Sequence, residues 1–273
     1  MRMAYEEQVA QYYEDGYFIA DDAFDPGMLA PLEAAARRAL AKVQSGEVVV
    51  KTEGISTGGP GDDTRDILGL IAPEFGEPLF AEYLGGKAIE RYMHALLGPD
   101  LRLGWVAIFA IPGPEAYDTG WHRDFSHEQR DGSKTVEMEI LGRHRKGVIK
   151  WHMALVDDAC LWLVPGSQKR YRTAEEREAL INEHFVELSD AVQIVLKKGQ
   201  TVFWNGNTIH RGRAFEGMPE RLAIMAALSQ HRDSDPPQQV EERFGWRMAE
   251  NIREGLPEKT RLYYDRWRSL QQD

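Results

Sequence analysis

The sequence predicts a mainly β domain, an antiparallel sandwich or barrel, with helical segments before and after it along the chain. After Gly98, short runs rich in β-branched and aromatic residues alternate with turn residues. Many short strands at such spacing are typical of antiparallel sandwiches and barrels. Both flanks place apolar residues at helical spacing instead. We therefore expect a single domain over 1–273, with a mostly helical part at 1–98, the β core at 99–230 and a helical tail at 231–273.

The N-terminal part carries two helix patterns around one short strand. Residues 5–15 place apolar and aromatic side chains at helical spacing, and Gly16 follows where a left-handed C-terminal cap would lie. The run YFIA then predicts a strand. Asp25 offers an N-cap to a second helix that starts at Pro26 and continues to Val43. A Gly- and Asp-rich loop and a third helix are expected at 54–63 and 89–97.

The β core is predicted from runs of strand-forming residues that are separated by turns. From residue 240 the pattern returns to helical spacing, with a Gly-Leu-Pro break. This tail could pack on a partner as easily as on its own barrel. The expected strands lie within 101–111, 147–156, 160–166, 192–199, 201–204 and 221–228.

The bulk composition narrows the class of partner. With 273 residues, 42% of them apolar and 28% charged, the chain can bury a sizeable core. A net charge of −11 argues against nucleic acid, which requires clustered Lys and Arg. Cys160 is the only cysteine, which excludes an intramolecular disulfide and a thiolate zinc cluster. Without a signal peptide or the roughly 18 apolar residues of a membrane helix, we expect a cytoplasmic protein that acts on a small molecule and not at a membrane.

The His-Arg-Asp motif at 122–124 fits two different chemistries. A protein-kinase catalytic loop has Asn five residues after the Asp, where this chain has Gln129, and no D-F-G or V-A-I-K motif accompanies it. The kinase interpretation therefore fails. In a non-haem iron site, His122 and Asp124 at positions i and i+2 of a strand would point to one face and could bind one metal ion.

An iron site of this kind needs a second imidazole from elsewhere in the chain. The same triplet recurs at 231–233, but no histidine follows it. His210 is the best-placed histidine downstream of the first copy, because it follows the strand TVFW and the hairpin pattern Asn205-Gly206. Apart from His127, which directly follows the motif region, the other histidines between the two copies are His144, His152 and His184.

Arg221 is expected to face the same site. If Ala214 lies opposite Pro219 across a four-residue loop, then His210 lies opposite Ala223, and Arg221 is two residues along on the same face. Two strand residues span roughly 7 Å, a suitable reach for a dicarboxylate that chelates iron at one end. Arginine is the residue best suited to bidentate capture of the other carboxylate.

Four blocks of sequence together resemble the phytanoyl-CoA dioxygenase family of iron(II)- and 2-oxoglutarate-dependent oxygenases. The opening helix, strand and helix from Tyr5 onward form the first block, and WHRD forms the second. WHMALVDDACLWLVPGSQKR resembles the strand that leads into the family's Pro-Gly-Ser/Thr-His-Lys turn. KKGQTVFWNGNTIHRGRAFEGMPERLAIMAAL resembles the segment with the family's distal histidine and the arginine eleven residues later. The likeness runs in order to about Gln230 and leaves the tail uncovered.

The resemblance implies a double-stranded β-helix, that is, a jelly-roll or cupin-like core. It assigns His122, Asp124 and His210 to iron as the catalytic centre, and Arg221 to the far carboxylate of 2-oxoglutarate. It implies an oxidoreductase that uses Fe(II), 2-oxoglutarate and O2 to hydroxylate a C–H bond of a metabolite, with release of succinate and CO2. Related halogenases have Ala or Gly at the position of Asp124, so this carboxylate favours hydroxylation or another oxidation. Desaturation and cyclisation are the alternatives.

The chain departs from the family pattern in three places. The family often has Ser or Thr two residues after the distal histidine, where it helps to hold the far carboxylate of 2-oxoglutarate. This residue is Gly212 here, so part of the binding site for that carboxylate is left unassigned. A short loop at Asp157-Asp158 lacks the family's Asn-Gly, and Gln168 replaces a histidine; we expect both to affect only local structure. A non-catalytic jelly-roll protein that binds a small molecule is the alternative from another class, although its signature, degenerate ligands, is not seen.

Two more regions are candidates for the site. Lys150 and Trp151 are candidate cofactor-binding residues on one strand, where Lys150 and His152 share one face and Trp151 has the other. Either face could point into the barrel, and packing is the alternative role of Trp151. The charged segment 127–147 is either a solvated loop or a lid over the iron that carries substrate contacts.

Overall fold

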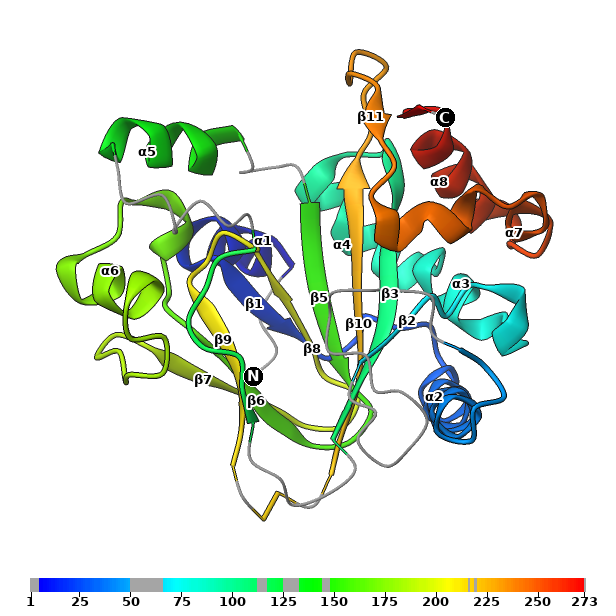
Figure 1. Cartoon of the computed structure of the whole chain (residues 1–273), viewed down its shortest axis with the longest axis horizontal. Helices are drawn as coiled ribbons and strands as arrows, with labels where there is room; N and C mark the ends of the chain where they lie inside the picture. Colours follow the sequence, from blue (N-terminus) through cyan, green and yellow to red (C-terminus); the bar gives the residue numbers. More distant parts are fainter. Residues whose placement is uncertain are drawn as a thin grey trace.

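Two antiparallel sheets face each other in the computed structural model, and helices cover one of them (Figure 1). The arrangement confirms the predicted mainly β fold with a jelly-roll core and flanking helices. The structure describes residues 5–49, 66–111, 117–124, 133–143, 148–215, 217–218 and 220–272. The loop expected at 54–63 lies outside these residues.

The larger sheet has six strands, each antiparallel to its neighbours. In spatial order they are β1 (Tyr17–Ala20), β8 (Thr201–Trp204), β5 (Val148–Ala154), β10 (Arg221–Gln230), β3 (Leu101–Ile111) and β2 (Asp66–Leu68). The smaller sheet has four strands, again antiparallel. They are β4 (Tyr117–Asp118), β9 (His210–Ala214), β6 (Asp158–Leu163) and β7 (Val192–Leu196).

Two expectations about strand pairing near β9 are wrong. Asn205-Gly206 does form a turn, but β8 and β9 belong to different sheets and make no hairpin. Likewise β10 does not pair with β9: Ala223 lies opposite Phe109 and Ala154 rather than opposite His210. The chain crosses from one sheet to the other at each of these connections. Turn residues fix where a strand ends, but they do not fix which sheet the next strand joins.

Strand β10 shows how the larger sheet separates the core from a cavity. Successive side chains of a strand point to opposite faces. One set packs with the helices in the main core and consists of Leu222, Ile224, Ala226 and Leu228. The alternate set lines a cavity between the sheets and includes Arg221, Met225, Ala227 and Ser229. The sheet is therefore apolar on its outer face and holds functional groups on its inner face.

The helices lie mainly on the outer face of the larger sheet, where α4 and α8 contact β3 (Figure 1). None of the described helices is long and apolar enough to cross a membrane. The helices are α1 (Tyr5–Asp15), α2 (Leu29–Gln44), α3 (Leu79–Leu84), α4 (Lys87–Leu97), α5 (Lys134–Arg143), α6 (Ala174–Ile181), α7 (Glu250–Glu254) and α8 (Glu258–Arg268). Short 3-10 helices lie at Pro73–Phe75, Ser167–Lys169 and Glu242–Met248, and β11 (Gln238–Gln239) pairs in parallel with β12 (Gln271–Gln272).

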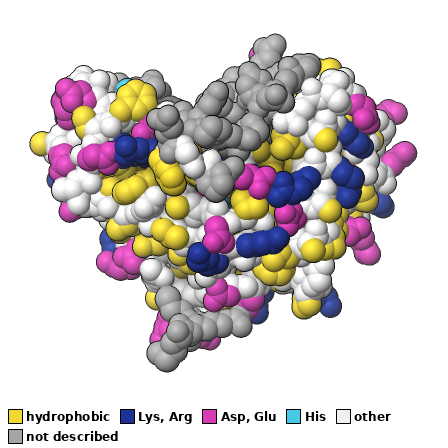
Figure 2. Space-filling view, turned by 90° about the horizontal axis from the view of Figure 1, so that it is seen from below, with side chains coloured by type: hydrophobic (Ala, Val, Ile, Leu, Met, Phe, Trp, Pro, Cys, Tyr) yellow, Lys and Arg dark blue, Asp and Glu magenta, His cyan; other side chains and the backbone are white. Residues whose placement is uncertain are grey.

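The face in Figure 2 carries Lys and Arg side chains interspersed with Asp and Glu side chains. Charges of both signs are therefore mixed on this face, although the whole chain has a net charge of −11.

The expected N-cap at Asp25 is wrong for α2 but right for another helix. Helix α2 begins at Leu29, and its cap residue Met28 makes no side-chain hydrogen bond. The carboxylate of Asp25 instead accepts hydrogen bonds from the backbone N–H groups of Lys87 (3.2 Å) and Ala88 (3.0 Å). These two groups open α4, where a carboxylate also complements the helix dipole. Asp25 therefore joins the N-terminal segment to α4.

The described part of the charged segment 127–147 is an anchored helix rather than a solvated loop. Glu137 of α5 is buried and lies 2.6 Å from the guanidinium of Arg123 and 2.8 Å from that of Arg172. Arg123 stands between the two residues of the His-x-Asp motif. The ion pair therefore ties α5 to the segment that carries this motif.

We expect Glu137→Gln to lower the free energy of unfolding by about 3–5 kcal/mol, because two buried guanidinium groups lose their shared counter-charge. Urea denaturation measures the change. Glu139→Gln is the matched control, because Glu139 is exposed on the same helix. Equal and small losses in both variants would contradict the anchoring role of Glu137.

Candidate metal centre

The His-x-Asp motif begins four residues after the end of β4, and it does not lie inside a regular strand as expected. His122 and His210 form an isolated antiparallel bridge, in which each backbone N–H donates to the other carbonyl at 3.0 Å. The backbone N–H of Asp124 donates to the carbonyl of Gly206 at 2.9 Å. The alternation of side chains still holds, because His122 and Asp124 line the cavity while Arg123 is buried on the other side.

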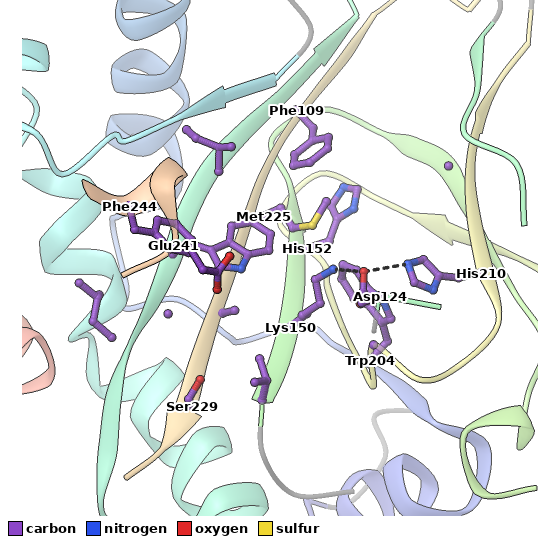
Figure 3. A pocket seen from close by; sticks show the side chains of 18 of the residues that line it. Phe109, Asp124, Lys150, His152, Trp204, His210, Met225, Ser229, Glu241 and Phe244 are labelled. Atoms are coloured by element: carbon purple, nitrogen blue, oxygen red, sulfur yellow. Dashed lines mark hydrogen bonds and ion pairs between the residues drawn. The ribbon is translucent and has the colours of Figure 1, made fainter. Parts of the chain in front are cut away.

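The side chains of His122, Asp124 and His210 converge on one point in space. One candidate ligand atom from each lies within 4.8 Å of the others. The ring centroids of the two histidines are 4.4 Å apart, and Nε2 of His210 is 3.7 Å from Oδ1 of Asp124 (Figure 3). Within the described ranges, these three residues form the group of His and carboxylate side chains that could hold a metal ion.

Both imidazoles are held in the form that binds metal through Nε2. Nδ1 of His122 lies 2.8 Å from the carbonyl of Gly120, and Nδ1 of His210 lies 2.8 Å from that of Thr208. A carbonyl only accepts hydrogen bonds, so Nδ1 carries the proton and Nε2 keeps its lone pair. Burial, and next the neighbouring His122, lower the pKa of His210 to about 3. His210 is therefore neutral at neutral pH.

Asp124 supplies the anionic donor. Burial opposes its ionisation, but the charge and hydrogen bond of Lys150, together with the neighbouring histidines, outweigh this effect and lower the pKa of Asp124 below its ordinary value. Oδ1 accepts a hydrogen bond from Nζ of Lys150 at 2.8 Å, and Oδ2 is buried with no hydrogen-bond partner in the described part of the chain. Oδ1 lies 3.7 Å from Nε2 of His210, and a carboxylate beside two imidazole lone pairs fits a first-row transition metal.

Gly206 leaves the room that this carboxylate needs. A Cβ atom at Gly206 would lie 2.2 Å from Oδ2 of Asp124, far inside the contact distance of two heavy atoms. The glycine of the Asn-Gly sequence is therefore required by the approach of Asp124 to the turn, and not by a hairpin.

The three residues line a cavity of about 610 Å³ that lies between the two sheets. Asp124 and His210 are labelled in the close view of this cavity (Figure 3). Lys150 and His152 of β5 also line it. Trp151 lies on the opposite face of β5, where it is fully buried in the core and donates from Nε1 to the hydroxyl of Tyr83 at 2.9 Å. The candidate cofactor role of Trp151 is thus corrected to packing, whereas Lys150 and Arg221 are in the cavity.

Arg221 is buried at the cavity wall with a partner that sequence reasoning missed. Its Nε donates to Oδ2 of Asp158 at 2.9 Å, and Nη1 donates to the hydroxyl of Tyr117 at 2.6 Å. Burial disfavours the charged form, but Tyr117 and Asp158 outweigh it and raise the pKa of Arg221 above its ordinary value. The Asp157-Asp158 loop was expected to matter only locally, and this is wrong, because Asp158 also lies 3.3 Å from Nε2 of His152.

The other candidates lie outside the metal centre. Nε2 of Gln168 donates to the carbonyls of Tyr13 and Glu14 (3.4 and 3.3 Å), so this departure ties a turn to the end of α1. In the second His-Arg-Asp copy, the side chain of Asp233 is fully exposed and that of His231 lies 3.5 Å from it. His127 and His144 lie outside the described residues.

The C-terminal tail forms a wall of the cavity that the sequence did not predict. It packs on its own barrel through α8 and β3. Amphipathic spacing indicated a helix, but it held no information about which surface the helix covers. The tail residues that line the cavity are Gln238, Gln239, Glu241, Phe244, Arg247, Trp267 and Gln271.

Comparisons with known proteins agree with this geometry. The sequence model of the family described as "Phytanoyl-CoA dioxygenase (PhyH)" matches residues 12–221. No curated protein matches the sequence significantly.

Several solved structures share the fold. EctD from S. alaskensis with bound Fe is 18% identical, with a TM-score of 0.62 over 84% of this chain and 77% of that chain. AviO1 from Streptomyces viridochromogenes is 17% identical, with a TM-score of 0.60 over 87% and 99%. The non-heme alpha ketoglutarate dependent epimerase SnoN from nogalamycin biosynthesis is 21% identical, with a TM-score of 0.56 over 83% of each chain. At these identities the likeness establishes the fold.

We expect Gly206→Ala to weaken binding of a divalent metal by about 10- to 100-fold, the usual effect of disturbing the support of a ligand. The new methyl group must displace the carboxylate of Asp124. Titration of the metal-free protein with Mn(II) by calorimetry measures the affinity. Gly142→Ala is the control, because a Cβ there meets nothing within 4 Å. Unchanged affinity in Gly206→Ala would show that Asp124 does not bind the metal.

Proposed function

The chain belongs to the phytanoyl-CoA dioxygenase family of iron(II)- and 2-oxoglutarate-dependent oxygenases, and we propose that it hydroxylates a C–H bond of a neutral small molecule. The convergence of His122, Asp124 and His210 is the observation that carries the proposal. When bound, iron, 2-oxoglutarate and O2 supply the oxidising chemistry, and succinate and CO2 are the co-products. The protein's own residues hold these groups and position the substrate.

In this proposal, the two imidazoles and one carboxylate hold Fe(II). Their backbone contacts fix the two rings before any metal arrives, since each Nδ1 is already bound to a carbonyl. Lys150 donates to Oδ1 of Asp124, the oxygen that lies 3.7 Å from Nε2 of His210, and so orients the carboxylate toward the imidazoles. Such support of a ligand by a neighbouring group tunes its orientation and affinity.

Arg221 is proposed to hold the far carboxylate of 2-oxoglutarate. Gly212 lies two residues, or roughly 7 Å, along β9 from His210. A Cβ at Gly212 would lie 2.4 Å from the hydroxyl oxygen of Tyr117, and this oxygen is 2.6 Å from Nη1 of Arg221. The guanidinium therefore lies near the metal ligands, at a spacing that suits a dicarboxylate. Since Lys150 is engaged with Asp124, we assign it to the metal ligand and Arg221 to the co-substrate. The buried, permanently charged guanidinium suits a carboxylate in a site that excludes water.

The part of the cavity beyond Lys150 is proposed to bind the substrate. Its charges are balanced: Lys150 faces Asp124, Arg102 lies 2.6 Å from Asp235, and Arg247 and Glu241 both line the cavity. Fe(II) and the 2-oxoglutarate dianion add no net charge. A neutral substrate is therefore favoured, with an apolar surface and several hydrogen-bonding groups. Aromatic and amide side chains available to it include Trp105, Phe244, Trp267, Gln238 and Gln271.

Hydroxylation is proposed because the carboxylate of Asp124 completes the ligand set. The structural neighbour SnoN is described as an epimerase, so the outcome of the oxidation is the finer part of the proposal. Mass spectrometry of the product distinguishes the outcomes: hydroxylation adds one oxygen atom, epimerisation adds none, and desaturation removes two hydrogen atoms. The screen should use neutral metabolites, with succinate release as the first readout.

We expect Asp124→Asn to lower Fe(II) affinity by at least about 100-fold and to abolish 2-oxoglutarate-dependent succinate formation, since it removes a ligand and not merely its support. Asp233→Asn in the second His-Arg-Asp copy is the matched control and should behave as the wild type. Metal affinity is measured anaerobically, and succinate by chromatography.

Two results would argue against the proposal. Equal effects of Asp124→Asn and Asp233→Asn would remove the assignment of the ligands. Metal-loaded wild-type protein that fails to bind 2-oxoglutarate would favour a non-catalytic jelly-roll protein that binds a small molecule.

A further inference from the structure

Gly212 has no side chain at the cavity wall, and Tyr117 occupies the space where one would lie. Gly212 lies two residues after His210 on β9, and it lines the cavity. A Cβ atom at Gly212 would lie 2.4 Å from the hydroxyl oxygen of Tyr117. Even the smallest side chain is therefore incompatible with the observed position of this hydroxyl. Glycine here is explained by Tyr117.

The pairing of β4 with β9 sets the position of Tyr117. Tyr117 lies opposite Ala214, and the next residues continue the contact. Thr119 donates from its backbone N–H to the carbonyl of Gly212 at 3.0 Å, and its hydroxyl accepts from the N–H of Gly212 at 2.8 Å. These bonds fasten the strand before the His-x-Asp motif to the strand that begins with His210. The tyrosine ring consequently lies over Gly212 and at the cavity.

Tyr117 connects the small sheet to the guanidinium on the large sheet. Its hydroxyl is 2.6 Å from Nη1 of Arg221. Arginine only donates hydrogen bonds, so the tyrosine oxygen is the acceptor in this contact. The tyrosine O–H is itself a donor group, and Tyr117 and Arg221 line the same cavity. The hydroxyl and the guanidinium therefore form a joint site for one carboxylate.

Because Asp158 already pairs with Arg221, a second hydrogen-bond donor strengthens the binding of a carboxylate at this place. Asp158 pairs with Nε of Arg221, so an arriving carboxylate meets a guanidinium whose charge is already partly compensated. A neutral O–H donor strengthens the binding of the carboxylate without adding charge. Hydrogen bonds to ionised oxygen atoms are among the strongest in proteins.

We propose that Tyr117 binds the far carboxylate of 2-oxoglutarate together with Arg221, in place of any side chain at position 212. This inference rests on the proposed function, because it takes 2-oxoglutarate as the ligand. It makes Tyr117 a co-substrate-binding residue and not merely a packing residue of β4.

Tyr117→Phe tests the inference, because it keeps the ring and removes only the hydroxyl. Calorimetry on anaerobic, Mn(II)-loaded protein should show binding of 2-oxoglutarate weakened by at least about tenfold. Binding of 2-oxopentanoate, the 2-oxo acid without the far carboxylate, should stay within about twofold of wild type. Tyr171→Phe, at a tyrosine outside the cavity lining, should leave both affinities unchanged.

A second variant tests the shared space. Gly212→Ser alone should disrupt 2-oxoglutarate binding, because its Cβ meets the tyrosine oxygen. Combined with Tyr117→Phe, the serine has room and brings a new hydroxyl, so affinity should recover at least in part. Recovery in the double variant would be strong support for a hydroxyl at this place.

The outcomes separate the inference from its premise. If wild-type protein binds 2-oxoglutarate and Tyr117→Phe binds it equally well, the inference is overturned. If Tyr117→Phe weakens both 2-oxo acids alike, its role is structural and the inference is again overturned. If metal-loaded wild-type protein binds no 2-oxoglutarate, the proposed function itself fails and the inference falls with it.

Discussion

The bridge between His122 and His210 is the constraint on which the site depends. Two backbone hydrogen bonds of 3.0 Å join the segment after β4 to the first residue of β9. Each histidine then bonds through Nδ1 to the carbonyl two residues before it, so one local geometry is used twice. Ring orientation, tautomer and separation therefore follow from main-chain pairing. A metal arriving here meets ligands whose rotamers are already fixed, which lowers the entropy cost of binding.

The second constraint is the two-sided character of the larger sheet. Its outer face is apolar and packs on helices, so its inner face can hold charged groups without weakening the core. β5 shows the division within three residues: Trp151 lies in the core, and Lys150 and His152 lie in the cavity. Burial of charge then requires compensation, which Asp124 gives to Lys150 and Asp158 gives to Arg221. The charged groups of the site are thus paired before any ligand enters.

Local patterns in the sequence predicted the elements well and their partners poorly. Strand runs, the helix at 89–97 and the gathering of His122, Asp124 and His210 were within reach of spacing and motif. The hairpin at Asn205-Gly206 was wrong, because the glycine serves the carboxylate of Asp124 rather than a paired strand. Asp25 was assigned to the wrong helix for a similar reason. Propensity reports what a residue can do, whereas the choice of partner is made by contacts between distant segments.

The residues that sequence reasoning missed share one property. Asp158 and Tyr117 reach the site across the barrel, through contacts with Arg221 that neither spacing nor a motif encodes. Compared with the family pattern, Gly212 lacks a hydroxyl side chain that would help to bind 2-oxoglutarate. In the structure, the absence of that side chain leaves room for the hydroxyl of Tyr117.

The tail that closes the cavity lies outside the region matched by the family model, yet it reaches to Gln271 at the far end of the chain. Side chains of the tail attach it to β3 and the residue before that strand. Arg247 donates to the carbonyl of Gly104, and Arg266 donates to Asp100 and to the carbonyl of Leu101. In the proposed function, part of the surface that contacts the substrate is thus encoded outside the stretch of the gene that encodes the metal ligands. Sequence changes in the tail can then alter substrate binding while the metal ligands stay unchanged.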